Sequence, residues 1–203
     1  MYRNFIKVII DYFLATLLLI LLSPLMFFIY LILFFKIGTP FFFQKRPGLN
    51  NKSFVLYKFK TILDKKCIFY NKKNKYFKLG LFLRNTGLDE LPQLINILKG
   101  DISLVGPRPL RINYLKIKAF KNHVRNKCKP GITGLAQLES YNIKNNKKNS
   151  RWEKNFKLDE YYFFNLSFLL DSKILFLTFF KFIKFSKKND FIKETKLLKK
   201  HIK

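Results

Sequence analysis

The feature that most constrains this chain is an uncharged apolar run of 24 residues, Tyr12 to Phe35, of which seventeen are Leu, Ile or Phe. At roughly −0.3 to −0.6 kcal/mol each, these seventeen side chains favour insertion into lipid by about 5 to 10 kcal/mol. The run is longer than the apolar core of a signal peptide, and it lacks a small-residue cleavage pattern. We therefore expect the segment to remain in the mature protein as a membrane element.

A proline stands near the centre of this run. Pro24 has no N–H for the carbonyl of Ile20 and costs about 3 kcal/mol in a straight helix, while Ser23 offers a hydroxyl to a freed carbonyl. Each half, about eleven residues or roughly 16 Å of helix, is too short for a hydrocarbon core of about 30 Å. Basic residues, which favour the cytoplasmic side, flank both ends: Arg3, Lys7, Lys36, Lys45 and Arg46. The pattern fits either a re-entrant helix-break-helix hairpin or one kinked transmembrane helix.

Charge narrows the classes of partner. The chain has 40 Lys+Arg against 12 Asp+Glu, a net charge of +28, which favours polyanions such as nucleic acid, anionic lipid or phosphorylated substrates. A nucleic-acid-binding protein does not need the apolar run, and no RNP, zinc or helix-turn-helix signature is present. Cys67 and Cys128 form no CxxC and no Cys/His cluster, so neither disulfides nor structural zinc are expected. We expect an anionic bilayer as a partner and no nucleic acid.

The rest of the chain predicts an α+β, mostly helical fold. Phe41–Gly48 leads into Ser53–Thr61, an aromatic and β-branched stretch typical of a short β-hairpin. Phe164–Phe185 has the pattern of a basic amphipathic helix that lies in the lipid interface. We expect a membrane protein in three parts: an apolar membrane segment (1–38), a small globular cytoplasmic domain with interfacial helices (39–186), and a basic tail (187–203).

A further helix is expected after residue 87, because apolar side chains recur there at helical spacing: Leu88, Leu91, Ile95 and Leu98. Gly100 ends this helix, and Asp89 and Glu90 open it. Pro92 is tolerated only near a first turn, which places the helix cap close to Asp89. Lys127–Gly134 is expected to be a turn-rich loop.

Two short motifs carry candidate chemistry. The adjacent carboxylates Asp89 and Glu90 can supply a nucleophile together with a base or metal ligand. Arg108, held between Pro107 and Pro109, offers a rigid fork for phosphate oxygens. Both motifs have structural alternatives, since acids are favoured at helix N-termini, where Asp is a preferred cap, and Pro-Arg-Pro can be a rigid surface turn.

Six motifs occur in a fixed order: Ser23-Pro24, Gln44–Gly48, Tyr57–Thr61, Arg84–Leu94, Lys99–Pro109 and Pro130–Gln137. Together they resemble the bacterial sugar transferase family, and the chain looks like the minimal, monotopic form of its polyprenyl-phosphate phosphoglycosyl transferases. The resemblance implies that residues 1–38 form the re-entrant hairpin of a monotopic membrane protein and that residues 39–186 are its cytoplasmic catalytic domain. It implies the transfer of a phosphosugar from a UDP-sugar, expected to be N-acetylated, to undecaprenyl phosphate. It also implies Mg²⁺ as cofactor, the cytoplasmic face of the bacterial inner membrane, and downstream glycosyltransferases as further partners.

The resemblance also implies roles for individual residues. Asp89 matches the nucleophile that attacks the β-phosphate of the UDP-sugar, forms an aspartyl phosphosugar and releases UMP, and it is also the expected magnesium ligand. Glu90 matches a residue that assists the acceptor or orients the site. The side chains expected to neutralise phosphate oxygens are Arg108, Arg84, Lys58 and Lys60. The two lysines would share one face of a strand, and their alternative role is that of solvated surface residues.

The chain departs from the family pattern in the run Glu139–Asn142, which replaces a frequent Asn-Gly-Arg-Asn sequence. Tyr141 stands where a phosphate-binding Arg is expected, and Arg151 lies in the insert that follows. Asp159 and Asp171 also match acidic positions of the family, and we expect structural roles for both. The alternative function left open is a catalytically inactive, membrane-anchored scaffold or binding protein.

Overall fold

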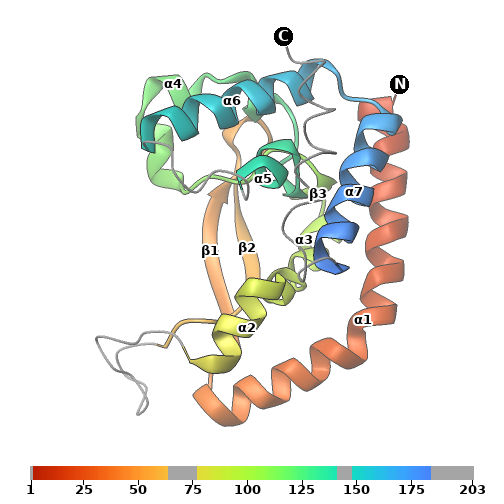
Figure 1. Cartoon of the computed structure of the whole chain (residues 1–203), viewed down its shortest axis with the longest axis vertical. Helices are drawn as coiled ribbons and strands as arrows, with labels where there is room; N and C mark the ends of the chain where they lie inside the picture. The colour runs from red at the N-terminus through yellow and green to blue at the C-terminus, as the bar shows by residue number, and fades with distance from the viewer. Residues whose placement is uncertain (1, 64–76, 141–147, 184–203) are drawn as a thin grey trace.

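The computed structural model describes residues 2–63, 77–140 and 148–183. Its elements are, in chain order, a π-helical turn (Tyr2–Ile6), α1 (Lys7–Ile37), β1 (Phe41–Pro47), β2 (Ser53–Phe59), α2 (Lys78–Thr86), α3 (Gln93–Leu98), β3 (Ser103–Val105), α4 (Lys118–Lys121), β4 (Gly131–Thr133), α5 (Leu135–Ser140), α6 (Lys148–Phe164) and α7 (Phe168–Ile183), with 3₁₀ turns at Leu49–Asn51, Leu88–Glu90, Ile112–Lys116 and Val124–Lys127. Helices predominate, and the strands form two separate two-stranded sheets. The predicted α+β, mostly helical class is confirmed. The other elements lie on the inner side of the long, bent α1 (Figure 1).

α1 runs continuously through Pro24, but its axis bends sharply about midway (Figure 1). The hydroxyl of Ser23 donates a hydrogen bond of 2.9 Å to the carbonyl of Ile20, the acceptor that Pro24 leaves without its helical donor. The predicted role of Ser23 is therefore confirmed, while the predicted break between two helices is corrected to a bend within one helix. The segment Tyr2–Ile37 is long and apolar enough to cross a membrane.

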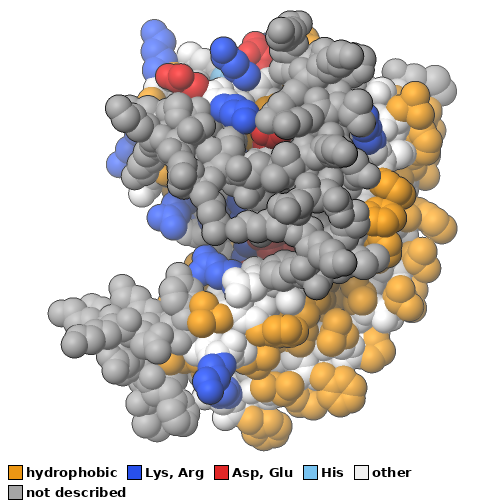
Figure 2. All heavy atoms as spheres, viewed as in Figure 1, with side chains coloured by type: hydrophobic (Ala, Val, Ile, Leu, Met, Phe, Trp, Pro, Cys, Tyr) orange, Lys and Arg blue, Asp and Glu red, His pale blue; other side chains and the backbone are white. Residues whose placement is uncertain are grey.

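Both halves of α1 pack against the same folded unit. In the first half, Ala15 is fully buried in the main core. In the second half, Ile29 and Leu33 join a smaller cluster with Phe59 of β2 and Leu83 of α2. Other faces of α1 keep large apolar side chains exposed, and Figure 2 shows hydrophobic side chains gathered over this side of the molecule. The exposed apolar surface indicates membrane association.

The predicted β-hairpin is present. β1 and β2 pair antiparallel, with Phe41 opposite Phe59 at the open end and Pro47 opposite Ser53 next to the turn. The hairpin is tied to α3 through Asn96, a fully buried side chain. Its Oδ1 accepts from the Tyr57 N–H at 3.0 Å, and its Nδ2 donates to a backbone carbonyl of β2 at 2.7 Å. This contact fixes β2 beside the segment that carries the two adjacent carboxylates.

The predicted helix after residue 87 consists of two pieces. Asp89 and Glu90 lie in the 3₁₀ turn Leu88–Glu90, and α3 starts only at Gln93, with Pro92 as its N-cap residue. The interruption changes the helical phase, so the predicted apolar stripe is wrong at Ile95, which is 40% exposed. The side chains that α3 buries in the core are Leu94 and Ile97.

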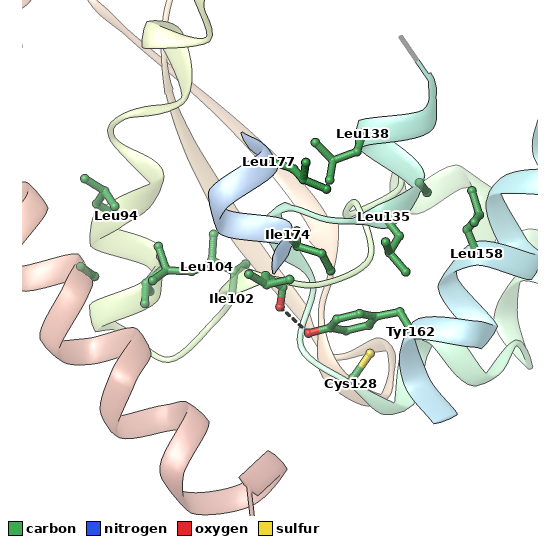
Figure 3. Packing of buried hydrophobic residues seen from close by; sticks show 14 of the residues in the cluster. Leu94, Ile102, Leu104, Cys128, Leu135, Leu138, Leu158, Tyr162, Ile174 and Leu177 are labelled. Carbon is green, nitrogen blue, oxygen red and sulfur yellow. Dashed lines mark hydrogen bonds between the residues drawn. The ribbon is translucent and has the colours of Figure 1, made fainter. Parts of the chain in front are cut away.

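The main core lies around a parallel pair of short strands, β3 and β4. Figure 3 shows the Tyr162 ring pointing into this core, and its hydroxyl lies 3.0 Å from the carbonyl oxygen of Val105. β4 corrects the prediction of a simple loop at Lys127–Gly134. The backbone approaches closely beside this strand pair and requires a glycine at residue 106. A Cβ at Gly106 would lie 2.5 Å from the carbonyl oxygen of Lys129.

The C-terminal helices differ from the prediction in their boundary. α6 ends at Phe164 and α7 begins at Phe168, where the Ser167 hydroxyl accepts a hydrogen bond of 3.3 Å from the Leu170 N–H as a cap. Phe179 of α7 is 60% exposed, in keeping with the predicted apolar outer face. The predicted tail, 187–203, lies outside the described residues.

Candidate active site

A cleft of about 1040 Å³ lies between the hairpin, the 3₁₀ turn Leu88–Glu90, the Pro-Arg-Pro segment and α6. Its lining includes the six charged residues predicted for the site: Lys58, Lys60, Arg84, Asp89, Glu90 and Arg108. Pro109 also lines the cleft, whereas Pro107 is buried and does not line it. Residues from four separate parts of the chain therefore meet in one cleft.

Glu90 is held by two cations. Its Oε1 pairs with Nζ of Lys58 and with Nη2 of Arg108, the second at 3.2 Å. Burial on its own raises the pKa of Glu90, but the charges and hydrogen bonds of Lys58 and Arg108 outweigh burial and hold this pKa below its usual value. Glu90 therefore carries a fixed negative charge that orients both cations.

Asp89 differs from its neighbour. It is only 7% exposed, yet its carboxylate makes no hydrogen bond with a residue of the described chain and caps neither the 3₁₀ turn nor α3. Burial raises its pKa, and Glu90 adds to this rise, while Lys58, Arg84 and Arg108 oppose it. Gly87 makes the position possible, because its φ of 74° ends α2 and turns the chain directly into the cleft wall. The capping alternative is not supported, and Asp89 is left as an available nucleophile or ligand.

The segment that carries Arg108 is held through three successive backbone carbonyls. The carbonyl of Pro107 accepts from the Gly131 N–H at 3.0 Å, and that of Pro109 accepts from Nη1 of Arg46 at 3.2 Å. The carbonyl of Arg108 itself accepts from Nη2 of Arg125. The Arg108 side chain nevertheless stays 57% exposed. A segment fixed in this way presents a guanidinium to the cleft, which suits an anion-binding role better than a plain surface turn.

The remaining predicted cations have different positions. Lys58 comes from β2 and Arg84 from the last turn of α2, so they approach the dyad from two sides. Lys60 lies just beyond β2, where its ammonium donates to the hydroxyl of Thr39 at 2.7 Å. We therefore assign the closest support of the dyad to Lys58, Arg84 and Arg108.

Three arginines of the cleft were not selected from the sequence: Arg46, Arg111 and Arg125. Arg46 lies in the Gln44–Gly48 motif and could have been chosen on that signal. Arg125 forms a buried ion pair of 3.1 Å with Asp159, and both side chains are about 5% exposed. This pair confirms the structural role expected for Asp159, although its partner carried no local sequence signal.

The fit of a magnesium ion to the cleft depends on Asp89. The described residues contain no cluster of three or more His, Cys, Asp or Glu that could form a metal cage. Mg²⁺ often binds through one or two carboxylates plus substrate phosphates. Asp89, whose carboxylate has no hydrogen bond among the described residues, fits that arrangement, whereas Glu90 is occupied by two cations.

Comparison with known proteins agrees with these motifs. The sequence model described as "Bacterial sugar transferase" matches residues 2–185. The chain belongs to the bacterial sugar transferase family.

Relatives within the family carry more specific names. The chain is 49% identical over 147 residues to the uncharacterized sugar transferase EpsL of Bacillus subtilis, covering 70% of each protein. It is 37% identical over 182 residues to a UDP-glucose:undecaprenyl-phosphate glucose-1-phosphate transferase of Klebsiella pneumoniae, covering 84% of this chain and 38% of that protein. It is 33% identical over 195 residues to an undecaprenyl-phosphate galactose phosphotransferase of Salmonella typhimurium, covering 86% and 40%. The chain thus spans about two fifths of the length of these two named transferases.

Two residues, Tyr141 and Arg151, mark the departure from the family pattern. Tyr141, which replaces the expected Arg, lies outside the described residues. Arg151 falls within α6, but its side chain is also outside the description. The sugar transferase cleft contains other cations that could bind phosphate, namely Arg46 and Arg111.

Proposed function

We propose that this protein transfers a sugar 1-phosphate from a UDP-sugar to undecaprenyl phosphate. The names of its relatives support the reaction class. The observation that carries the proposal is the difference between two adjacent carboxylates: Glu90 is charge-paired, whereas Asp89 is buried in the cleft with no hydrogen bond to a described residue. One carboxylate is thus fixed as an electrostatic support and the other is available to react.

In the first step, an oxygen of the Asp89 carboxylate attacks the β-phosphorus of the UDP-sugar. A bond forms between this oxygen and phosphorus, the bond from that phosphorus to the bridging oxygen breaks, and UMP leaves with the electron pair. The product is an aspartyl phosphosugar. Lys58 and Arg108, oriented by Glu90, neutralise the charge that gathers on the phosphate oxygens.

In the second step, a phosphate oxygen of undecaprenyl phosphate attacks the same phosphorus. The bond to Asp89 breaks, the carboxylate is restored, and undecaprenyl diphosphate-sugar is released. Asp89 and the donor diphosphate are the groups that would hold Mg²⁺, which when bound offsets repulsion between the carboxylate and the phosphates. A two-step exchange lets a water-borne donor and a membrane-borne acceptor use one carboxylate in turn.

We further propose that α1 enters and leaves the same leaflet, at the cytoplasmic face of the bacterial inner membrane. Two observations support this placement: basic residues flank both ends of the apolar run, and both halves of α1 pack on the same folded unit. A helix that crossed the bilayer would separate its two ends, whereas here Lys7 and Leu33 both contact the folded unit.

Release of UMP by the purified full chain tests the reaction. The assay contains magnesium, undecaprenyl phosphate and a panel of donors that includes UDP-N-acetyl sugars, UDP-glucose and UDP-galactose, with each component omitted in turn. The proposal predicts release that depends on one donor and forms a lipid-linked sugar. Folded protein that releases no UMP with any donor would support the inactive scaffold instead.

A further inference from the structure

The lining of the cleft contains two chemically different groups of side chains. One group is apolar and includes Leu18 and Leu22 of α1, together with Ile132. The other group contains Arg46 and Arg111, with Tyr114 near Arg46. Asp89 and Glu90 belong to the same cleft, so a substrate with an apolar part and a substrate with a charged, aromatic part can each be matched to one group.

Arg46, in the arginine group of the cleft, has a donor without a partner among the described residues. Its Nη1 donates to the carbonyl of Pro109 at 3.2 Å and its Nη2 to Oε1 of Gln44 at 2.6 Å, but its buried Nε makes no hydrogen bond within the described part of the chain. Burial lowers the pKa of Arg46, and the nearby charges of Arg108 and Arg111 lower it further. Three guanidinium groups that repel one another beside an unused donor favour a bound anion.

Aromatic side chains also belong to the lining of the cleft. Tyr114 and Phe156 both line the cleft, and both pack on Phe120, with ring centroids 5.3 Å and 4.7 Å away. Asn155 also lines the cleft, and an amide can both donate to and accept from the edge of a pyrimidine. Rings supported from behind are suited to contact a planar base.

We propose that this group of arginines and aromatic side chains is the nucleotide subsite of the donor. Arg46 and Arg111 bind the phosphate that departs with the nucleoside, and Tyr114 and Phe156 contact the base. This assignment rests on the proposed function, which supplies the nucleoside diphosphate. Arg108 links the two regions, because its side chain pairs with Glu90 while its segment is anchored by Arg46.

The apolar part of the lining suits the lipid substrate better than the arginines do. Leu18 and Leu22 belong to α1, which also exposes large apolar side chains, so the polyprenyl chain is matched to these residues. We therefore place the donor nucleotide, and not the lipid phosphate, at Arg46 and Arg111.

Arg111→Gln is the clean test of the phosphate contact. Arg111 is an exposed cleft residue that precedes the 3₁₀ turn Ile112–Lys116, and Lys116→Gln removes the same charge from the exposed end of that turn, outside the cleft lining. Titration calorimetry on the full chain in detergent, with UMP as the probe, should show at least about 10-fold weaker binding for Arg111→Gln and unchanged binding for Lys116→Gln. In turnover, the KM for the UDP-sugar should rise while the KM for undecaprenyl phosphate stays the same.

Tyr114→Leu tests the base contact. Binding of UMP should weaken roughly 5-fold or more, because an aromatic ring stacked on a base is lost, whereas binding of inorganic pyrophosphate should not change. Equal losses for both probes would contradict a base contact.

The outcomes separate this inference from the proposed function. If the wild-type chain binds and releases UMP but Arg111→Gln binds UMP as tightly, the nucleotide subsite is wrong and the reaction stands. If the KM for undecaprenyl phosphate rises instead, the arginines serve the lipid phosphate and the inference is again overturned. If the wild-type chain neither binds nor releases UMP, the proposed reaction itself fails.

Discussion

The hydroxyl of Tyr162 lies 3.0 Å from the carbonyl oxygen of Val105 and 2.8 Å from Oδ1 of Asp171. Asp171 also accepts from Nζ of Lys7 at 2.6 Å and from the hydroxyl of Tyr2 at 2.7 Å. One buried network therefore joins the start of the membrane helix, α6 and α7 to the strand that leads into the Pro-Arg-Pro segment. The position of the Pro-Arg-Pro segment is thus fixed relative to α1.

Tyr162→Phe should destabilise the fold because it leaves buried acceptors without this donor. The expected loss is about 1 to 3 kcal/mol, and each kcal/mol corresponds to about 2 to 4 °C in Tm for a protein of this size. Thermal unfolding followed by circular dichroism in detergent measures the change. Tyr161→Phe on the same helix is the matched control, since the part of the chain that is described gives no hydrogen bond to its hydroxyl. Equal Tm values for the two variants would contradict the network's role.

Asp89→Asn should abolish turnover and stabilise the protein. Loss of the attacking carboxylate should lower the rate of UMP release by at least about 1000-fold. The pKa of Asp89 is raised in the folded state, so the folded protein binds the carboxyl proton of Asp89 more tightly than the unfolded chain does. Ionisation of Asp89 at neutral pH therefore lowers the stability of the fold, and a neutral Asn removes this loss. We expect a higher Tm from the same unfolding experiment. A lower Tm would instead favour a capping role.

Removal of Lys58 should change the pH dependence of the reaction. The Asp89 carboxylate must be ionised to attack, and its raised pKa places the acid limb of the kcat/KM profile above the usual range for Asp. The charge of Lys58 lowers this pKa, so Lys58→Met should move the acid limb to still higher pH. Lys52→Met, at an exposed position of the same hairpin, is the control and should leave the limb in place. An unchanged limb in Lys58→Met would show that Lys58 does not support Asp89.

The re-entrant topology predicts that both ends of α1 lie in the cytoplasm. In a chain carrying Cys67→Ser and Cys128→Ala, single cysteines in Asn4→Cys and Lys45→Cys should react with a membrane-impermeant maleimide only after the inner membrane is opened. Both native positions are exposed. Labelling of Asn4→Cys but not Lys45→Cys in intact spheroplasts would identify a helix that spans the membrane.

Local patterns in the sequence were sufficient for several parts of the site. The hairpin follows from two β-prone runs and a short turn, and the Ser23 contact with Ile20 follows from the donor that Pro24 lacks. Asp89 and Glu90 are consecutive in the chain, so the sequence alone places them together. It does not predict their different environments, because these depend on side chains that come from other elements.

The parts that the sequence did not predict depend on long-range contacts. The pairing of β3 with β4 rests on backbone bonds between segments far apart in the chain, and nothing in Lys127–Gly134 marks a strand. The same holds for the ion pair of Arg125 with Asp159 and for Arg111 in the cleft wall. Pro92 predicts a helix cap close to Asp89, but α3 begins only after Pro92, and this later start changes which side chains are buried.

The most direct measurement of the central claim is the intact mass of the protein after incubation with its UDP-sugar and magnesium in the absence of undecaprenyl phosphate. The account predicts an added mass of one phosphosugar, mapped by peptide analysis to Asp89, lost on addition of undecaprenyl phosphate and absent in Asp89→Asn. Sustained turnover with both substrates and no adduct on Asp89, or an adduct on another residue, would contradict it.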